Sequence, residues 1–362
     1  MKTIVSIASL MLLAVGAAHG QATIAGSKNY ESAIPYFKDL PKWDPSYKAP
    51  RTPDGKPDLQ GVWSSASLTT LERGVSYGGG IKIDSLVIPD AQVAKLTGES
   101  YYAQAYKQQG GKSNLAEGAF KDKNAGAGYN AFWIDPGAEY AKVDGEYRSS
   151  WITSTANGRV PYSAAGRAAR AQRVAGFRAA KNTGPESRTL GDRCLISYTG
   201  QAGPPMVNGM YNNHYQIVQT PSNVMIDTEM AHDARVITVG GKQRPDAIKQ
   251  WFGDSVAHWD GETLVVETRN VHPVQSVGGF VPLSPKGMVT ERFTRKASNI
   301  LLYQFEVADP EFYSETWKGE MPLRLSKEHI YEYACHEGNY ALPGILRGDA
   351  QGLDTAIEKN GE

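Results

Sequence analysis

The sequence lacks the features that mark several large functional classes. Its 38 Lys and Arg balance 38 Asp and Glu, so the formal net charge is zero. Without an excess of basic charge, we predict no nucleic-acid partner. After the first twenty residues no segment is apolar enough to cross a membrane. The content of 41% hydrophobic and 10% aromatic residues still predicts a globular protein.

The short motifs of common cofactor sites are also missing. Neither Gly-x-x-x-x-Gly-Lys nor Gly-x-Gly-x-x-Gly precedes a helix, which argues against nucleotide and dinucleotide sites. His-Glu-x-x-His, Cys-x-x-Cys, His-x-His and the Gly-x-Ser-x-Gly elbow do not occur. We therefore expect no cofactor and no metal. One alternative stays open, a metal held by His214, His258 and Glu229 from separate strands.

The N-terminus has the parts of an export signal. Lys2 supplies a positive charge, residues 4–18 are apolar, and Ala18-His19-Gly20 places small residues where a signal peptidase reads them. We predict a signal peptide over residues 1–20 and a periplasmic or secreted protein. The alternative is an uncleaved anchor, which the polar residues from Gln21 onward disfavour.

Cysteine is scarce, and the only two are Cys194 and Cys335. In an oxidising compartment we expect them to form a disulfide. Such a bridge would close a loop of about 140 residues and stabilise the fold by restricting the unfolded chain. The alternative is a nucleophilic thiol beside His336.

The N-terminal half predicts loops and helices attached to one domain. Residues 21–57, rich in Pro, Lys and Tyr, indicate an extended arm. An insertion of loops is predicted over about 64–128, with a helix near 89–108. A second, Ala-rich helix is predicted over about 163–181, and its arginines indicate a solvated face. Residues 349–362 indicate a flexible C-terminal tail.

From residue 211 the chain alternates short strands and tight turns. Asp260-Gly261 is the strongest hairpin signal. Strands in hairpin order expose their edges unless the sheet closes on itself. We therefore predict a mainly β fold, a single domain over 58–348 built on an antiparallel up-and-down, lipocalin-like β-barrel. The predicted strands are 131–134, 148–153, 213–220, 224–230, 235–239, 255–259, 263–270, 289–294, 300–307, 315–325 and 330–335.

Several strings resemble those of known secreted proteins. Gly61-Val62-Trp63 resembles the Gly-x-Trp opening strand of lipocalin-like barrels. Longer strings resemble a large family of secreted, mostly uncharacterised bacterial proteins over about residues 50–348. These strings are Pro57–Trp63 (PDLQGVW), Tyr129–Trp133 (YNAFW), His232–Arg235 (HDAR), His258–Val266 (HWDGETLVV) and Tyr331–Tyr340 (YEYACHEGNY).

In length and export signal, the chain is also similar to the cofactor-independent γ-formaldehyde lyases that act on lignin-derived phenylcoumarans. The family of secreted proteins implies the fold and the export. The likeness to the lyases implies cleavage of a carbon–carbon bond, and it carries no catalytic residue over to a position of this sequence.

Alternation along the strands places ionisable side chains where the interior of a barrel can collect them. The predicted catalytic residues are His214 or His258 as base, Glu229 as a buried base, and Tyr333 as a proton donor or acceptor toward a phenol. Structural alternatives stay open for each: a histidine bonded to a carbonyl, a packed turn residue, a surface carboxylate and a core tyrosine.

The predicted substrate-binding residues are Asn213, Tyr215, Arg235, Arg148 and Trp133. Arg235 can instead pair with Glu229 or Asp233, and Arg148 can pair with Asp135. Within the string at 232–235, Asp233 is typical of a turn. Because a change of register by one residue exchanges the two faces of a strand, the sequence leaves the inward set open.

These observations predict an enzyme, a lyase or isomerase that acts on a small lignin-derived aromatic substrate by acid–base chemistry. A base removes a proton from a hydroxyl, a carbon–carbon bond breaks, and Tyr333 or Arg235 stabilises the departing phenolate. Two alternatives are a periplasmic lipocalin-like binding protein for a small apolar ligand and a structural protein of the envelope. A homo-oligomer also stays open.

Overall fold

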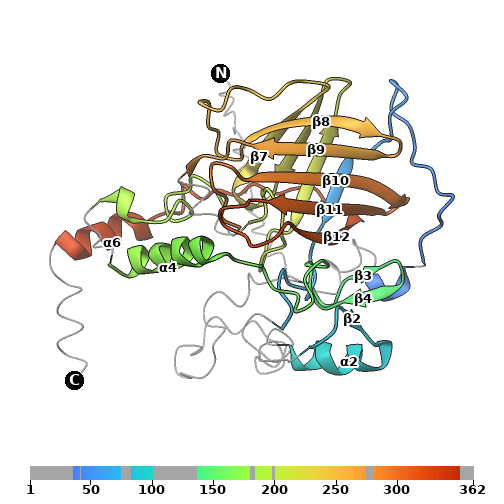
Figure 1. The fold of residues 1–362 in the computed structure, drawn as a ribbon, viewed down its shortest axis with the longest axis horizontal. Coiled ribbons are helices and arrows are strands. Elements are labelled where there is room, and N and C mark those ends of the chain that lie inside the picture. The colour runs from blue at the N-terminus through green and yellow to red at the C-terminus, as the bar shows by residue number, and fades with distance from the viewer. Residues whose placement is uncertain are drawn as a thin grey trace, which may run out of the picture.

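Strands of the C-terminal half and one strand at residues 61–64 close into a barrel in the computed structural model (Figure 1). The structure describes residues 36–40, 42–74, 83–100, 137–179, 184–197, 200–273 and 281–350. The barrel strands are β1 (Gly61–Ser64), β5 (His214–Gln219), β6 (Asn223–Thr228), β7 (Asp233–Val239), β8 (Asp254–Asp260), β9 (Thr263–Arg269), β10 (Met288–Ala297), β11 (Ile300–Ala308) and β12 (Trp317–Ser326).

The strand order around the barrel is β1-β12-β11-β10-β9-β8-β7-β6-β5, and β1 closes the ring between β12 and β5. Nine strands cannot alternate in direction all the way around a ring. The mismatch falls between β7 and β8, which run parallel through two residue pairs, Thr238 with Val256 and Val239 with Ala257. The predicted β-barrel is confirmed, with one parallel pair that the sequence did not reveal.

Alternate residues of each strand point into the barrel, as the two-residue period of a strand requires. The largest inward side chains are at most 2% exposed; they are Trp63, Tyr215, Phe293, Tyr303, Phe305 and Trp317. Successive ring centroids from Phe293 to Trp317 lie 5.1–5.7 Å apart, so aromatic packing fills this part of the interior. Burying one such side chain contributes about 1.5–3 kcal/mol, so these rings stabilise the barrel together with the aliphatic side chains packed around them.

A second, smaller sheet lies beside one end of the barrel (Figure 1). It contains β2 (Val87–Ile88), β4 (Glu146–Arg148) and β3 (Lys142–Val143), in that order. The helix α2 (Asp90–Glu99) packs on it through Leu96, which joins a separate cluster with Ile88 and Tyr147. The strand predicted over 148–153 is therefore displaced: β4 ends at Arg148, and isolated bridges at Ser150 and Ile152 follow.

The Ala-rich helix predicted over 163–181 and the hairpin predicted at Asp260-Gly261 are both present. The helix α4 (Ala164–Ala179) begins after Ser163, whose Oγ accepts a hydrogen bond from the Gly166 backbone N–H at 3.0 Å, a typical N-cap. In the hairpin, Gly261 has φ of +56°, a conformation that glycine adopts without strain.

The prediction of a strand over residues 330–335 is wrong. This segment is irregular, and Tyr331 is 65% exposed. The physical reason is the closure of the barrel: β12 already pairs with β11 on one side and with β1 on the other, so it offers no edge to a further strand.

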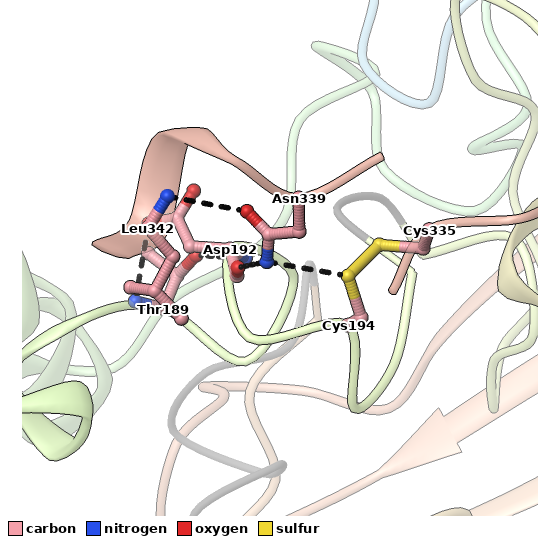
Figure 2. The surroundings of a disulfide bond; sticks show 6 residues. All are labelled: Thr189, Asp192, Cys194, Cys335, Asn339 and Leu342. Atoms are coloured by element: carbon pink, nitrogen blue, oxygen red, sulfur yellow. Dashed lines mark hydrogen bonds between the residues drawn. A yellow bond between two sulfur atoms is a disulfide. The ribbon is translucent and has the colours of Figure 1, made fainter. Parts of the chain in front are cut away.

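The predicted disulfide is confirmed. Cys194 and Cys335 are bonded, with their Cα atoms 5.7 Å apart and a sequence separation of 141. Figure 2 shows that Asn339 supports the bridge: its Nδ2 donates to the Asp192 carbonyl at 2.7 Å and to Cys194 Sγ at 3.5 Å. The short helix α6 (Ala341–Ala350) follows and is labelled in Figure 1.

Several predictions fall outside the described residues. These are the signal peptide over 1–20, residues 21–35 of the arm over 21–57, the strand over 131–134, and the tail beyond residue 350. Within the described ranges, we find no helix with the length and apolar character of a membrane span.

Candidate functional site

A buried histidine–carboxylate pair lies at one end of the barrel wall. His214 begins β5 and Glu229 follows the last residue of β6, and His214 Nδ1 lies 2.8 Å from Glu229 Oε2. The same Oε2 also accepts the His214 backbone N–H at 3.2 Å. The side chains are only 3% and 9% exposed. A carboxylate oxygen accepts hydrogen bonds, so the tautomer that satisfies this contact carries its hydrogen on Nδ1.

His214 lies on the outer face of the barrel wall, the face opposite the aromatic interior. In the strand register it pairs with Ser64 on β1, and Ser64 pairs in turn with Arg324 on β12. All three residues are at most 6% exposed. The register therefore sets a histidine, a hydroxyl and a guanidinium side by side across three strands.

Segments from the N-terminal half cover this outer face. Arg324 Nη2 donates to the Ala66 carbonyl at 2.6 Å, and its guanidinium carbon lies 3.9 Å from the centre of the Phe37 ring. Burial raises the pKa of Glu139, although the Phe37 backbone N–H and the charge of Arg324 act in the opposite direction. The site therefore combines a fixed positive charge, an aromatic ring and little water.

The backbone on both sides of the pair is constrained. Asn212, Ala231 and His232 have φ of +53°, +63° and +50°, in the left-handed region that residues other than glycine adopt at a cost. Asn213 supports the turn before His214: its Oδ1 accepts the Gly209 N–H at 2.8 Å, and its Nδ2 donates to the Gly209 carbonyl at 3.1 Å. Asn213 thus holds the strand start instead of presenting a free amide to a substrate.

Arg235 and Tyr215 point into the barrel, on the other side of the wall from His214. Arg235 Nη1 and Nη2 contact Glu291 at 3.0 and 2.5 Å, and Tyr303 Oη donates to Glu291 at 2.9 Å. Burial by itself lowers the pKa of Arg235, but the charge and the hydrogen bonds of Glu291, with Tyr303 and Tyr215, together outweigh burial and the net shift is upward. Arg235 therefore pairs with Glu291, and neither of its two predicted partners is involved.

Glu291 and Arg324 are ionisable residues that sequence reasoning missed. The side chain of Glu291 is fully buried. A signal was present, because Glu291 stands between Val289 and Phe293 on the apolar, inward face of β10. A carboxylate on such a face needs a buried cation as its partner.

The other predicted site residues do not gather around His214. His258 is exposed on the outer face of β8, in register with Val265 on β9. Arg148 Nε contacts Glu320 at 3.0 Å and its Nη1 contacts Glu146 at 2.8 Å, so it forms an ion-pair network. Trp133 and Asp135 lie outside the described residues.

The backbone of Tyr333 contacts the turn that follows β6. Its backbone N–H donates to His232 Nε2 at 2.8 Å. His232 is three residues after Glu229 in the chain. The contact attaches the disulfide-bonded segment to the turn that follows β6. Tyr333 is half-buried.

Asp233 is a second buried carboxyl near this end of the barrel. It is 6% exposed and accepts the Ser197 backbone N–H at 2.8 Å. Burial raises the pKa of Asp233 to about 7, and the hydrogen bonds from Ser197 only partly oppose this shift. The folded protein therefore holds this proton over a pH range in which the unfolded chain releases it.

We expect Asp233 to make the protein less stable as the pH rises from about 4 to about 7. Between these values the folded state binds more protons than the unfolded state, so the free energy of unfolding falls with pH. From the shift of the pKa from 3.8 to about 7, the loss is on the order of 4 kcal/mol. Asp233→Asn keeps an acceptor for Ser197 and should flatten this slope, as measured by urea unfolding at pH 4.5 and pH 8.

The exposed Asp246→Asn is the matched control and should keep the wild-type slope. Equal pH slopes for Asp233→Asn and wild type would show that Asp233 does not hold the proton.

No three His, Cys, Asp or Glu side chains in the described part of the chain gather into a metal site, and the trio of His214, His258 and Glu229 is not assembled. Comparison with protein-family models, with curated proteins and with solved structures finds no match for the chain.

Proposed function

We propose that the protein is an acid–base enzyme in which His214 is the general base and Glu229 fixes its tautomer and stabilises its protonated form. The observation that carries the proposal is the contact of 2.8 Å between His214 Nδ1 and Glu229 Oε2 in a nearly dry site. Low water content strengthens such a pair, and a base oriented by a carboxylate is the usual arrangement for removing a hydroxyl proton.

We further propose that the reaction is cleavage of a carbon–carbon bond in a small lignin-derived aromatic substrate. His214 Nε2 takes the proton of a hydroxymethyl group, and the bond from that carbon to its neighbour breaks to give formaldehyde. The electron pair forms a carbon–carbon double bond and expels the phenolate of an adjacent ether. The proton on His214 then passes to the phenolate, so formaldehyde and a stilbene are the only products.

Arg324 is the residue that we propose to stabilise the phenolate. It is on the same outer face as His214, one strand beyond Ser64, and its guanidinium packs on the Phe37 ring. A cation beside an aromatic ring suits an anionic aromatic group. Arg235, the earlier candidate, is on the opposite side of the wall and is neutralised by Glu291.

The proposal places the protein in the periplasm or outside the cell. The disulfide is of the kind that persists in oxidising compartments, and the first twenty residues have the pattern of an export signal. A carrier role for the barrel interior has less support, because packed aromatic rings occupy much of that interior.

The test is incubation of the purified protein with a phenylcoumaran-type dimer that carries a free hydroxymethyl group. We expect equal amounts of formaldehyde and stilbene, measured by trapping of the aldehyde and by absorbance of the stilbene. A matched dimer with a methyl ether in place of that hydroxyl should not react. Absence of both products from the free alcohol, with folded and oxidised protein, would overturn the lyase proposal.

A further inference from the structure

Ser64 is a buried hydroxyl next to the proposed base. It ends β1, it is fully buried, and its Oγ accepts a hydrogen bond from the Ala66 N–H at 3.2 Å. Among the described residues, the structure gives this oxygen no contact in which it donates. Because a buried hydroxyl is stabilised by donating as well as accepting, the hydrogen of Ser64 needs an acceptor nearby.

The register of β1 and β5 places that hydroxyl beside His214. Ser65 N–H donates to the Asn213 carbonyl at 2.9 Å, so residues 65 and 213 form a hydrogen-bonded pair. Pairs alternate along an antiparallel ladder, which makes Ser64 and His214 a non-hydrogen-bonded pair. Side chains approach closely in such pairs, with Cβ atoms about 4.5–5.5 Å apart.

We propose that Ser64 is a nucleophile that His214 and Glu229 activate, and that the protein therefore transfers acyl groups from small esters to water. The proposal rests on the same base as the proposed function but requires a different reacting hydroxyl. A serine, a histidine and a carboxylate that are neighbours in this order define such a site by geometry and not by sequence motif, and here the strand register sets Ser64 beside His214. This explains how the site can exist without the Gly-x-Ser-x-Gly elbow.

The step is balanced without any further cofactor. Ser64 Oγ forms a bond to the acyl carbon, and its proton moves to His214 Nε2. The ester carbon–oxygen bond breaks, and the leaving alcohol takes the proton from His214. A water molecule then hydrolyses the acyl-serine by the same route in reverse order. Arg324, the register neighbour of Ser64 on β12, supplies positive charge next to the developing oxyanion.

The test is covalent labelling of the oxidised full-length protein with a fluorophosphonate and with the smaller phenylmethylsulfonyl fluoride, followed by intact mass and peptide mapping. We expect one adduct per chain, on Ser64. Ser64→Ala should give no adduct, and His214→Ala should label at least about 100-fold more slowly. Ser150→Ala is the control, because Ser150 is equally buried but donates to the Ile152 carbonyl; it should label as wild type does.

The two proposals can fail separately. Labelling at Ser64 without formaldehyde release from the dimer would leave the acyl-transfer activity and overturn only the lyase. Formaldehyde release without an adduct from either probe, or with adducts only on other residues, would overturn the role of Ser64 and leave His214 as the base of the lyase.

Discussion

Glu291→Gln should destabilise the protein by about 3–5 kcal/mol, the largest effect that we expect of a single substitution on stability. Glu291 accepts hydrogen bonds from both terminal nitrogens of Arg235. The substitution therefore leaves the guanidinium of Arg235 charged and buried with only neutral partners. It also weakens the hydrogen bond from Tyr303 Oη. Urea unfolding of the oxidised protein at pH 7 gives the difference in free energy, with an unchanged m-value as the check on the unfolded state.

Two further variants test whether this cost is specific to the buried Arg235–Glu291 pair or common to every ion pair of the protein. Glu306→Gln removes the carboxylate from a pair with Lys318, whose side chain is 59% exposed, and should cost less than about 1 kcal/mol. The double variant Arg235→Met with Glu291→Leu removes both charges and should recover much of the loss. If Glu291→Gln costs no more than Glu306→Gln, the interior pair does not carry the energy assigned to it.

His214→Ala should lower kcat for release of formaldehyde by at least about 100-fold, which is the largest effect that we expect on activity. The substitution removes the group that we propose takes the hydroxyl proton. Glu229→Gln keeps an acceptor for Nδ1 but loses the negative charge that stabilises the protonated ring. Its kcat should therefore lie between those of wild type and His214→Ala. Steady-state kinetics with the phenylcoumaran dimer gives kcat and KM for each variant.

His258→Ala is the matched control for this experiment. His258 is exposed on β8 and does not contact the pair, so its replacement should leave both kcat and KM within about twofold of wild type, as surface substitutions away from a site usually do. A His214→Ala variant that is folded and retains wild-type kcat would remove the histidine from the mechanism.

The sequence predicted most of the barrel because most of its contacts are local. Each strand from β5 to β7, and from β8 to β12, pairs with its neighbour in the chain, so alternation and turn residues such as Asp260-Gly261 were sufficient. The prediction failed where pairing is distant. The short strand β1 lies some 150 residues before β5 and more than 250 before β12, and its position decides that the segment 330–335 is no strand.

The site was predicted only in part, for a related reason. His214 and Glu229 were both selected, but alternation cannot tell which face of a strand points inward. The structure places His214 outside and Tyr215 inside the same wall. Glu291 and Arg235 could have been paired only by knowing that β7 and β10, which are not neighbours, face each other across the interior. Side-chain contacts across a barrel leave no periodic signal in the sequence.

The disulfide has a consequence for how the chain tolerates damage. It joins a loop before β5 to the segment after β12, so those strands belong to one covalent ring. A single cut by a protease in any turn of the ring, such as that at Gly261, linearises the ring without freeing a fragment. The cut ends are still held in place by neighbouring strands. Only a second cut within the ring, or chemical reduction, allows a piece of the barrel to leave.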